Sequence, residues 1–203
     1  MNADVNVNMN ILICGVGGQG IILTSKLIAA AAMAWGIPVM SAETIGMAQK
    51  GGSVCSFLRL GEGLYGPMFP ESAAGLLMAF EPAEAVRMLP YLEPGGRLIV
   101  NSYPIMPPTA ALAGAEYTGG EMLDYLRRNV ERLTVVDGEG ACRSLGSPKV
   151  LNMVMLGAAL SAESPSRAGD ALPFSVDGVD AVMRQTVDAR FHDLNSRALR
   201  YKA

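Results

Sequence analysis

The sequence predicts an α/β fold: a single doubly wound, mostly parallel sheet with helices on both faces, followed by a helical C-terminal tail. Three observations favour this class. Short apolar runs, typical of buried strands, alternate with longer helical runs. A glycine cluster over residues 15–20 joins the first strand to the first long helix, as in Rossmann-like three-layer folds. The length of 203 residues suits one unit, so residues 1–203 are expected to form a single domain.

The composition is apolar and slightly acidic. Hydrophobic residues make up 50% and charged residues 17% of the chain, with a mean hydropathy of +0.28. This fits a compact domain rich in alanine and valine, or a subunit whose surface a partner covers. The net charge of −3 offers no basic surface for nucleic acid. No apolar run reaches the length of a membrane span, and the first nine residues do not resemble a secretion signal, so we expect a cytoplasmic protein.

Cysteine and histidine are too few for most metal chemistry. The three cysteines, Cys14, Cys55 and Cys142, are far apart in the sequence and form no zinc or iron–sulfur spacing. We expect them to be reduced, with Cys14 in the core. His192 is the only histidine, which leaves little support for metal hydrolysis or a Ser–His triad. Any redox centre is expected on another chain.

The first element is a buried strand ending at Cys14, and the glycine loop after it leads into a helix over Ile21–Trp35. Gly15, Gly17 and Gly20 stand in the G-x-G-x-x-G register, which allows a tight turn, close approach of an anion and helix packing. The helix N-terminus would direct unpaired N–H groups at a phosphate, a carboxylate or another protein's backbone. A tight strand–helix corner that binds no nucleotide is the alternative.

A second strand is predicted over Ile37–Ala42, after a helix C-cap at Gly36. Glu43 would end it at the position where a dinucleotide-binding enzyme holds a ribose, which favours an NAD-binding hypothesis. The loop that follows, residues 44–52, contains Lys50 beside two glycines. It could form an anion-binding nest of backbone amides, or a fixed turn at a protein interface.

The remaining elements follow in order along the chain. The predicted strands are Ser53–Leu60, Gly75–Phe80, Arg97–Asn101 and Thr134–Asp137, with a short extended segment over Leu64–Pro70; the predicted helices are Pro82–Leu89, Glu121–Glu131, Lys149–Leu160 and one or two within Val176–Tyr201. Glu81 stands at the end of a strand where open α/β sheets place ligands. Asn152 is polar within an apolar helix, and we expect its amide to hydrogen-bond a loop backbone.

Four stretches together resemble the gamma subunit or domain of the 2-oxoacid:ferredoxin oxidoreductases, and within that family the small (beta) subunit of the indolepyruvate enzymes. They are Cys14–Ile21, Glu43–Val54, Glu81–Arg87 with Leu92–Gly96, and Asn152–Gly157. The glycine loop alone is common, whereas the block from Glu43 to the double glycine is the specific part. Two positions depart from the family pattern: Ile45 and Lys50 stand where it usually has histidine and arginine. Lysine keeps the charge but loses the forked geometry of arginine.

The resemblance implies a chain that is inactive alone and completes a larger enzyme. Thiamine diphosphate and iron–sulfur clusters would lie on a large partner subunit, with ferredoxin as electron acceptor and coenzyme A as acyl acceptor. The isolated chain could self-associate through its apolar face. A stand-alone NAD- or FAD-binding oxidoreductase and a purely structural interface module are the alternatives.

The two glycine-containing loops are predicted to converge at the C-terminal edge of the sheet, to face the thiamine-bearing subunit and to offer a cradle for the phosphates of coenzyme A. No residue is assigned a catalytic role and no metal ligand is expected. The predicted binding or interface residues are Gly15, Gly17, Gly18, Gln19, Gly20, Glu43, Thr44, Gly46, Met47, Gln49, Lys50, Gly51 and Gly52.

Overall fold

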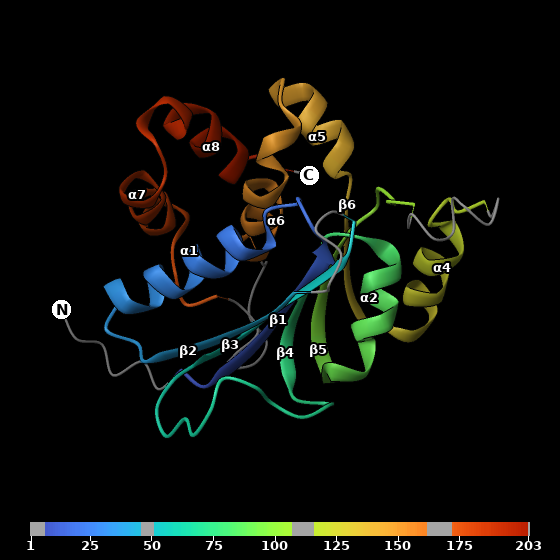
Figure 1. Cartoon of the computed structure of the whole chain (residues 1–203), viewed down its shortest axis with the longest axis horizontal. Coiled ribbons are helices and arrows are strands. Elements are labelled where there is room, and N and C mark those ends of the chain that lie inside the picture. The colour runs from blue at the N-terminus through green and yellow to red at the C-terminus, as the bar shows by residue number, and fades with distance from the viewer. Residues whose placement is uncertain (1–6, 46–50, 107–115, 162–171, 203) are drawn as a thin grey trace.

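The computed structural model describes residues 7–45, 51–106, 116–161 and 172–202. It confirms the α/β prediction, with one sheet between two layers of helices (Figure 1). The strands are β1 (Met9–Val16), β2 (Val39–Ile45), β3 (Ser53–Leu60), β4 (Ala74–Ala79), β5 (Leu92–Asn101) and β6 (Arg132–Val136). They lie in the order β2-β3-β1-β4-β5-β6.

The sheet is parallel from β1 through β4 and β5 to β6, while β3 runs antiparallel to both of its neighbours. Because β3 lies between β1 and β2, the second strand along the chain does not pair with the first. The second strand also begins and ends later than predicted, so that Glu43 lies within β2 and not beyond its end. The segment Leu64–Pro70, predicted to be extended, joins no strand of the sheet.

Helices cover both faces (Figure 1). The first face carries α1 (Ile21–Ala34), α5 (Gly138–Leu145), α6 (Leu151–Leu160), α7 (Val176–Thr186) and α8 (His192–Leu199); the second carries α2 (Pro82–Met88) and α4 (Gly120–Asn129). Short 3-10 turns lie at Leu89–Tyr91 (η1), Pro148–Val150 (η2) and Ala189–Phe191 (η3). None of the described helices is long and apolar enough to cross a membrane.

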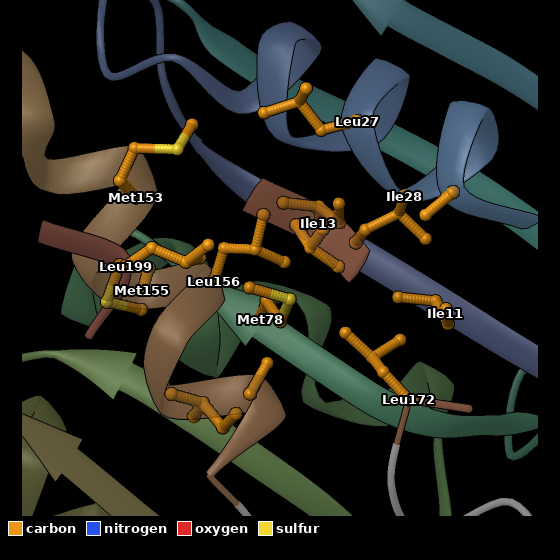
Figure 2. Packing of buried hydrophobic residues seen from close by; sticks show 14 of the residues in the cluster. Ile11, Ile13, Leu27, Ile28, Met78, Met153, Met155, Leu156, Leu172 and Leu199 are labelled. Carbon is orange, nitrogen blue, oxygen red and sulfur yellow. The ribbon is translucent and has the colours of Figure 1, made fainter. Parts of the chain in front are cut away.

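Two apolar cores follow from the alternation of side chains along each strand. In β1, Ile11 and Ile13 belong to the core under α1 and α6, whereas Leu12 and Cys14 belong to the core under α2 and α4. Figure 2 shows Ile13 between side chains of α1 and Leu156 of α6, with Met78 of β4 nearby, whereas Ile11 lies farther along β1, toward Leu172. Strands buried on both faces explain why the sequence has continuous apolar runs and little alternation.

Capping residues set several helix boundaries. Gly36 has a left-handed φ of 73° and follows Trp35, the C-cap residue of α1, so the glycine ends the helix as predicted, one position beyond the cap. Glu81 caps α2, since its Oε2 accepts a hydrogen bond of 3.0 Å from the Glu84 amide. The helix α5 was not predicted; Asp137 starts it by accepting from the Gly140 amide at 2.9 Å. α6 begins at Leu151, later than predicted, because Pro148–Val150 form a 3-10 turn.

Candidate functional site

The two predicted loops meet at one edge of the sheet. The Gly17 amide donates a hydrogen bond of 2.9 Å to the Gly52 carbonyl, which extends the antiparallel pairing of β1 with β3 by one step. An added Cβ at Gly17 would lie 3.6 Å from the same carbonyl, an ordinary contact. The described parts of the two loops are therefore neighbours. Gly46, Met47, Gln49 and Lys50 lie outside the described residues.

Gln19 turns back from the glycine loop and bridges the ends of two parallel strands. Its Oε1 accepts a hydrogen bond of 2.7 Å from the Val16 amide, and its Nε2 donates one of 2.8 Å to the Phe80 carbonyl. The crossovers after β1 and β4 run to opposite faces, so the Gln19 carboxamide lies at the topological switch point of the sheet. A Cβ at Gly15 would come within 2.7 Å of Gln19 Oε1, so glycine is required there to admit this side chain.

Asn101 joins the same network from the end of β5. This buried side chain donates a hydrogen bond of 3.0 Å from Nδ2 to the Phe80 carbonyl, and its Oδ1 accepts one of 3.2 Å from the Gly138 amide. Together Gln19 and Asn101 connect β1, β4, β5 and the start of α5. Asn101 is not among the residues predicted from the sequence, although a polar residue at the end of an apolar strand at this edge is a signal that could have identified it.

A pocket of about 450 Å³ opens beside this network on the face covered by α1, α5 and α6. Its volume lies within the range of ligand pockets, roughly 300–1,000 Å³. Its walls come from the glycine loop, the start of α1, the segment after β5, the start of α5, and the η2–α6 junction. The lining residues are Gly18, Gln19, Gly20, Leu23, Asn101, Tyr103, Ile105, Gly138, Glu139, Cys142, Pro148, Lys149, Leu151 and Asn152.

Asn152 is the most informative residue of this pocket. It is only 4% exposed and packs against Gly20, where an added Cβ would lie 2.9 Å from the Asn152 Cβ. We expected its amide to bind a loop backbone, but among the described residues none hydrogen-bonds the Asn152 carboxamide. Because the Asn152 oxygen and nitrogen are not among the fully buried polar atoms, and the residue lines the pocket, its carboxamide is open to the pocket and can hydrogen-bond a ligand there.

The surroundings of Asn152 favour an anionic ligand. α1 starts from Gly20 in a left-handed conformation, with φ of 86°, and no side chain of the described chain caps it. The first N–H groups of a helix of this length carry partial positive charge toward the pocket. Lys149 adds a full positive charge to the lining, while Glu139 contributes one carboxylate. The arrangement suits a group that bears phosphate and also presents hydrogen-bonding atoms.

Other selected residues do not reach this pocket. Glu43 and Thr44 are exposed on the edge strand β2, and Glu43 is level with Ser56 of β3, which in turn pairs with Ile13. A ribose bound at the switch point would therefore be one strand farther from Glu43 than in a dinucleotide-binding fold, which removes support from NAD binding. Lys26 is exposed on α1 and does not line the pocket.

Glu81 has a structural task at the same edge. It is 2% exposed, caps α2, and accepts a short hydrogen bond of 2.5 Å from the Tyr117 hydroxyl. Burial and the adjacent Glu81 carboxylate raise the pKa of Tyr117 well above its usual value. The hydroxyl therefore stays protonated and donates to Glu81, while it also accepts a hydrogen bond of 3.1 Å from the Ala83 amide; the two bonds hold the first turn of α2 in place.

The chain's donor set does not fit an iron–sulfur cluster. Such clusters take four cysteine thiolates, and the whole sequence has three cysteines. Cys142 lies on the face opposite to the one that holds Cys14 and Cys55. Within the described ranges there is no group of three or more His, Cys, Asp and Glu side chains placed to hold a metal ion.

Comparisons with known proteins agree with this architecture. The family model described as pyruvate ferredoxin/flavodoxin oxidoreductase matches residues 10–201. The indolepyruvate oxidoreductase subunit IorB of Archaeoglobus fulgidus is 36% identical, over 96% of this chain and 93% of that protein. The subunit of the same name from Methanothermobacter thermautotrophicus is 38% identical, over 96% and 95%.

Two solved structures share the fold at lower identity. Pyruvate oxidoreductase subunit PORC from Thermotoga maritima superposes with a TM-score of 0.66 at 19% identity, covering 96% of this chain and 94% of that one. A 2-oxoglutarate:ferredoxin oxidoreductase from Magnetococcus marinus, solved with 2-oxoglutarate, coenzyme A and succinyl-CoA bound, gives a TM-score of 0.67 at 21% identity. There the match covers 95% of this chain and 30% of that chain.

Proposed function

The chain belongs to the pyruvate ferredoxin/flavodoxin oxidoreductase family, and from this membership we infer that it is the small subunit of a 2-oxoacid:ferredoxin oxidoreductase of the indolepyruvate type. The family expected from the four sequence stretches is thereby confirmed. The assignment to indolepyruvate rests on the two IorB relatives, which match this chain over almost its whole length.

The subunit works within a larger complex. Thiamine diphosphate on the large partner subunit supplies the electron sink for decarboxylating the 2-oxoacid, the electrons pass to ferredoxin, and coenzyme A accepts the acyl group. The three cysteines of this chain cannot complete a four-cysteine cluster, which supports placing the iron–sulfur centres on the partner. The loops that meet at Gly17 and Gly52 face the thiamine-bearing subunit and close one side of its active site.

The pocket beside the glycine loop receives the phosphate-bearing part of coenzyme A. The single observation that carries this proposal is the Asn152 carboxamide, which lines the pocket beside the uncapped start of α1 and has no hydrogen-bond partner among the described residues. Helix N-termini favour phosphate, and Lys149 supplies the counter-charge. Gln19 and Asn101 hold the strand ends rigidly beneath the pocket, which reduces the entropy lost when a ligand binds.

The assembled complex provides the test. The chain is co-expressed with the large subunit, and turnover is followed with ferredoxin and a panel of 2-oxoacids that includes indolepyruvate, pyruvate and 2-oxoglutarate. We expect the highest kcat/KM with indolepyruvate and no turnover by the isolated chain. Failure of the two chains to co-purify would contradict the subunit role, and a preference for pyruvate or 2-oxoglutarate would contradict the substrate.

Coenzyme A binding is tested separately through Asn152→Asp, which keeps the shape of the side chain and places a carboxylate where phosphate is expected. We expect the KM for coenzyme A to rise about tenfold or more, equivalent to about 1.4 kcal/mol, with kcat and the KM for the 2-oxoacid unchanged. Lys149→Ala should act in the same direction. Lys26→Ala is the matched control, since it removes an exposed positive charge of α1 that does not line the pocket.

The isolated chain gives a second measurement. Coenzyme A at 100 times its dissociation constant should add about 2.7 kcal/mol to the free energy of unfolding, visible as a thermal shift that Asn152→Asp reduces. An unchanged KM for coenzyme A in Asn152→Asp would show that coenzyme A does not bind in this pocket, and the chain would then have an interface role alone. Stabilisation by NAD or FAD in place of coenzyme A would support the stand-alone oxidoreductase.

A further inference from the structure

Cys14 and Cys55 are direct cross-strand neighbours in the antiparallel pair formed by β1 and β3. The hydrogen bond from the Gly17 amide to the Gly52 carbonyl marks a hydrogen-bonded pair in the same register. Since hydrogen-bonded and non-hydrogen-bonded pairs alternate, the Cys14–Cys55 pair, three steps along, is non-hydrogen-bonded. Opposite Cα atoms in such pairs lie about 4.5 Å apart, within the range of about 4.4–6.8 Å that a disulfide bridges.

Both thiols are on the same face of the sheet. Cys14 and Cys55 belong to the apolar core under α2 and α4, together with Leu12 and Phe57. Cys14 is fully buried and Cys55 is 4% exposed, and both are reduced in this structure. The coenzyme A pocket opens on the opposite face, so neither thiol belongs to it.

Arg87 of α2 lies over Cys55. Its Nη2 is 3.6 Å from the Cys55 sulfur and also contacts Ser53 and Glu84, while the arginine side chain is 47% exposed. Burial raises the pKa of both thiols. The positive charge of Arg87 acts in the opposite direction on both, and at Cys55 the hydrogen bond from Arg87 lowers the pKa as well. The Glu84 carboxylate raises the pKa of both thiols, and the Glu81 carboxylate also raises the pKa of Cys14. Cys55 is thus both nearer to solvent and closer to the positive charge.

We propose that Cys14 and Cys55 are a redox modification site, where hydrogen peroxide converts the two thiols into a reversible intramolecular disulfide. The Cys55 sulfur attacks one peroxide oxygen, the O–O bond breaks, and a sulfenic acid and one water form. The Cys14 sulfur then attacks the Cys55 sulfur, the S–O bond breaks, and the hydroxide leaves as water with the Cys14 proton. In total two thiols and one peroxide give one disulfide and two waters, with sulfur oxidised and peroxide oxygen reduced.

The position of this pair connects it to the glycine loops. Cys14 directly precedes Gly15, and Cys55 lies three residues after Gly52, so the bond would join the two strands that carry both loops. Formation of this bond depends on the register of β1 and β3 and on the surroundings of the two sulfurs, and not on the proposed function.

The test uses the full chain treated with hydrogen peroxide, then denatured and alkylated. We expect the untreated chain to alkylate at three cysteines and the oxidised chain at one, Cys142, with an intact mass lower by two hydrogen atoms before alkylation. Proteolysis should release the peptides of Cys14 and Cys55 joined by a bond that dithiothreitol cleaves. Cys142→Ala is the matched control and should form the same bond.

Two single variants test the order of the steps. Cys14→Ala should leave a Cys55 sulfenic acid that dimedone traps, whereas Cys55→Ala should leave Cys14 alkylatable after the same treatment. Three alkylatable thiols in the oxidised wild-type chain, a disulfide that includes Cys142, or a bond between two chains would each overturn the proposal. Because the wild-type chain carries the decisive measurement, a variant that fails to fold does not affect it.

Discussion

Gln19 and Asn101 donate hydrogen bonds to one acceptor, the main-chain carbonyl of Phe80, over 2.8 and 3.0 Å. One donor comes from the loop after β1 and the other from the end of β5, and the carbonyl directly follows β4. Three parallel strands are therefore held together at the edge where the pocket opens. The shared acceptor means that the two side chains should contribute to stability as a coupled pair.

A double-mutant cycle measures this coupling. Either Gln19→Met or Asn101→Leu leaves the Phe80 carbonyl with one of the two donors, whereas the double variant removes both. We expect each single variant to lower the free energy of unfolding by about 1–3 kcal/mol, and the double variant to lose about 0.5–3 kcal/mol more than their sum. Urea unfolding of the four proteins gives the numbers. Losses that add to within about 0.5 kcal/mol would contradict a shared role.

Gly20 and Gly18 provide a matched comparison within one loop. Both have positive φ, of 86° and 103°, so alanine is strained at either position. Nothing lies within 4 Å of an added Cβ at Gly18, but at Gly20 the Asn152 Cβ would be 2.9 Å away. We expect Gly18→Ala to lower the free energy of unfolding by about 1–2 kcal/mol and Gly20→Ala to lower it further. Equal losses would show that Asn152 moves aside freely.

Removing the hydroxyl of Tyr117 should destabilise the first turn of α2. Tyr117→Phe takes a donor from the buried Glu81 carboxylate and an acceptor from the Ala83 amide. We expect a loss of about 1–3 kcal/mol in the free energy of unfolding. Tyr125→Phe is the control, because Tyr125 is 43% exposed and should change stability by less than about 0.5 kcal/mol. Similar values for both variants would contradict this role of Tyr117.

Asp180 should make stability depend on pH in the acid range. Burial alone would raise the pKa of Asp180, but hydrogen bonds from Ser196 and Arg184 and the charge of Arg200 lower it overall. The Asp180 carboxylate therefore stabilises the folded chain at pH values above the unfolded-state pKa of about 3.9. This stabilisation is lost as pH falls through the lower folded-state pKa.

The variant Asp180→Asn tests this dependence. Near pH 7 it should lower the free energy of unfolding by about 1–2 kcal/mol. The loss is no larger because Arg184 and Arg200 are partly exposed, and solvent screens their charges. The difference between the two proteins should shrink as pH falls below about 3.9. Urea unfolding across that range measures it, and a difference that stays constant down to pH 2 would exclude the carboxylate as its source.

Much of the fold was predictable because its signals are local. The β1 run up to Cys14, the helices that begin at Ile21 and Pro82, and the glycine at Gly36 depend on neighbouring residues and were all placed closely. Helix α5 was missed because its short sequence from Gly138 contains two glycines and few apolar residues. Its start depends on Asp137 and on the hydrogen bond from Gly138 to Asn101, a residue in another strand.

The candidate site could be predicted from the sequence only in part. The glycine spacing identified Gly18, Gln19 and Gly20, which line the pocket, but it could not identify Asn101 or Tyr103 as their neighbours. Glu43 was selected because a dinucleotide-binding fold holds a ribose at the end of its second strand, which in that fold lies next to the first. The insertion of β3 between them is a long-range pairing for which the sequence offers no local signal.

By itself the sequence determined the class of fold, the loops that leave the sheet at its C-terminal edge, and the family to which the chain belongs. It could do so because apolar periodicity, glycine spacing and motif order are properties of residues close together or in a set order in the chain. Only the tertiary structure decided that Gln19 bridges the ends of β1 and β4, that Asn152 lines the pocket with no hydrogen-bond partner among the described residues, and that Cys14 lies opposite Cys55. These relationships depend on strand order and register, which are fixed when distant segments bury their apolar faces together.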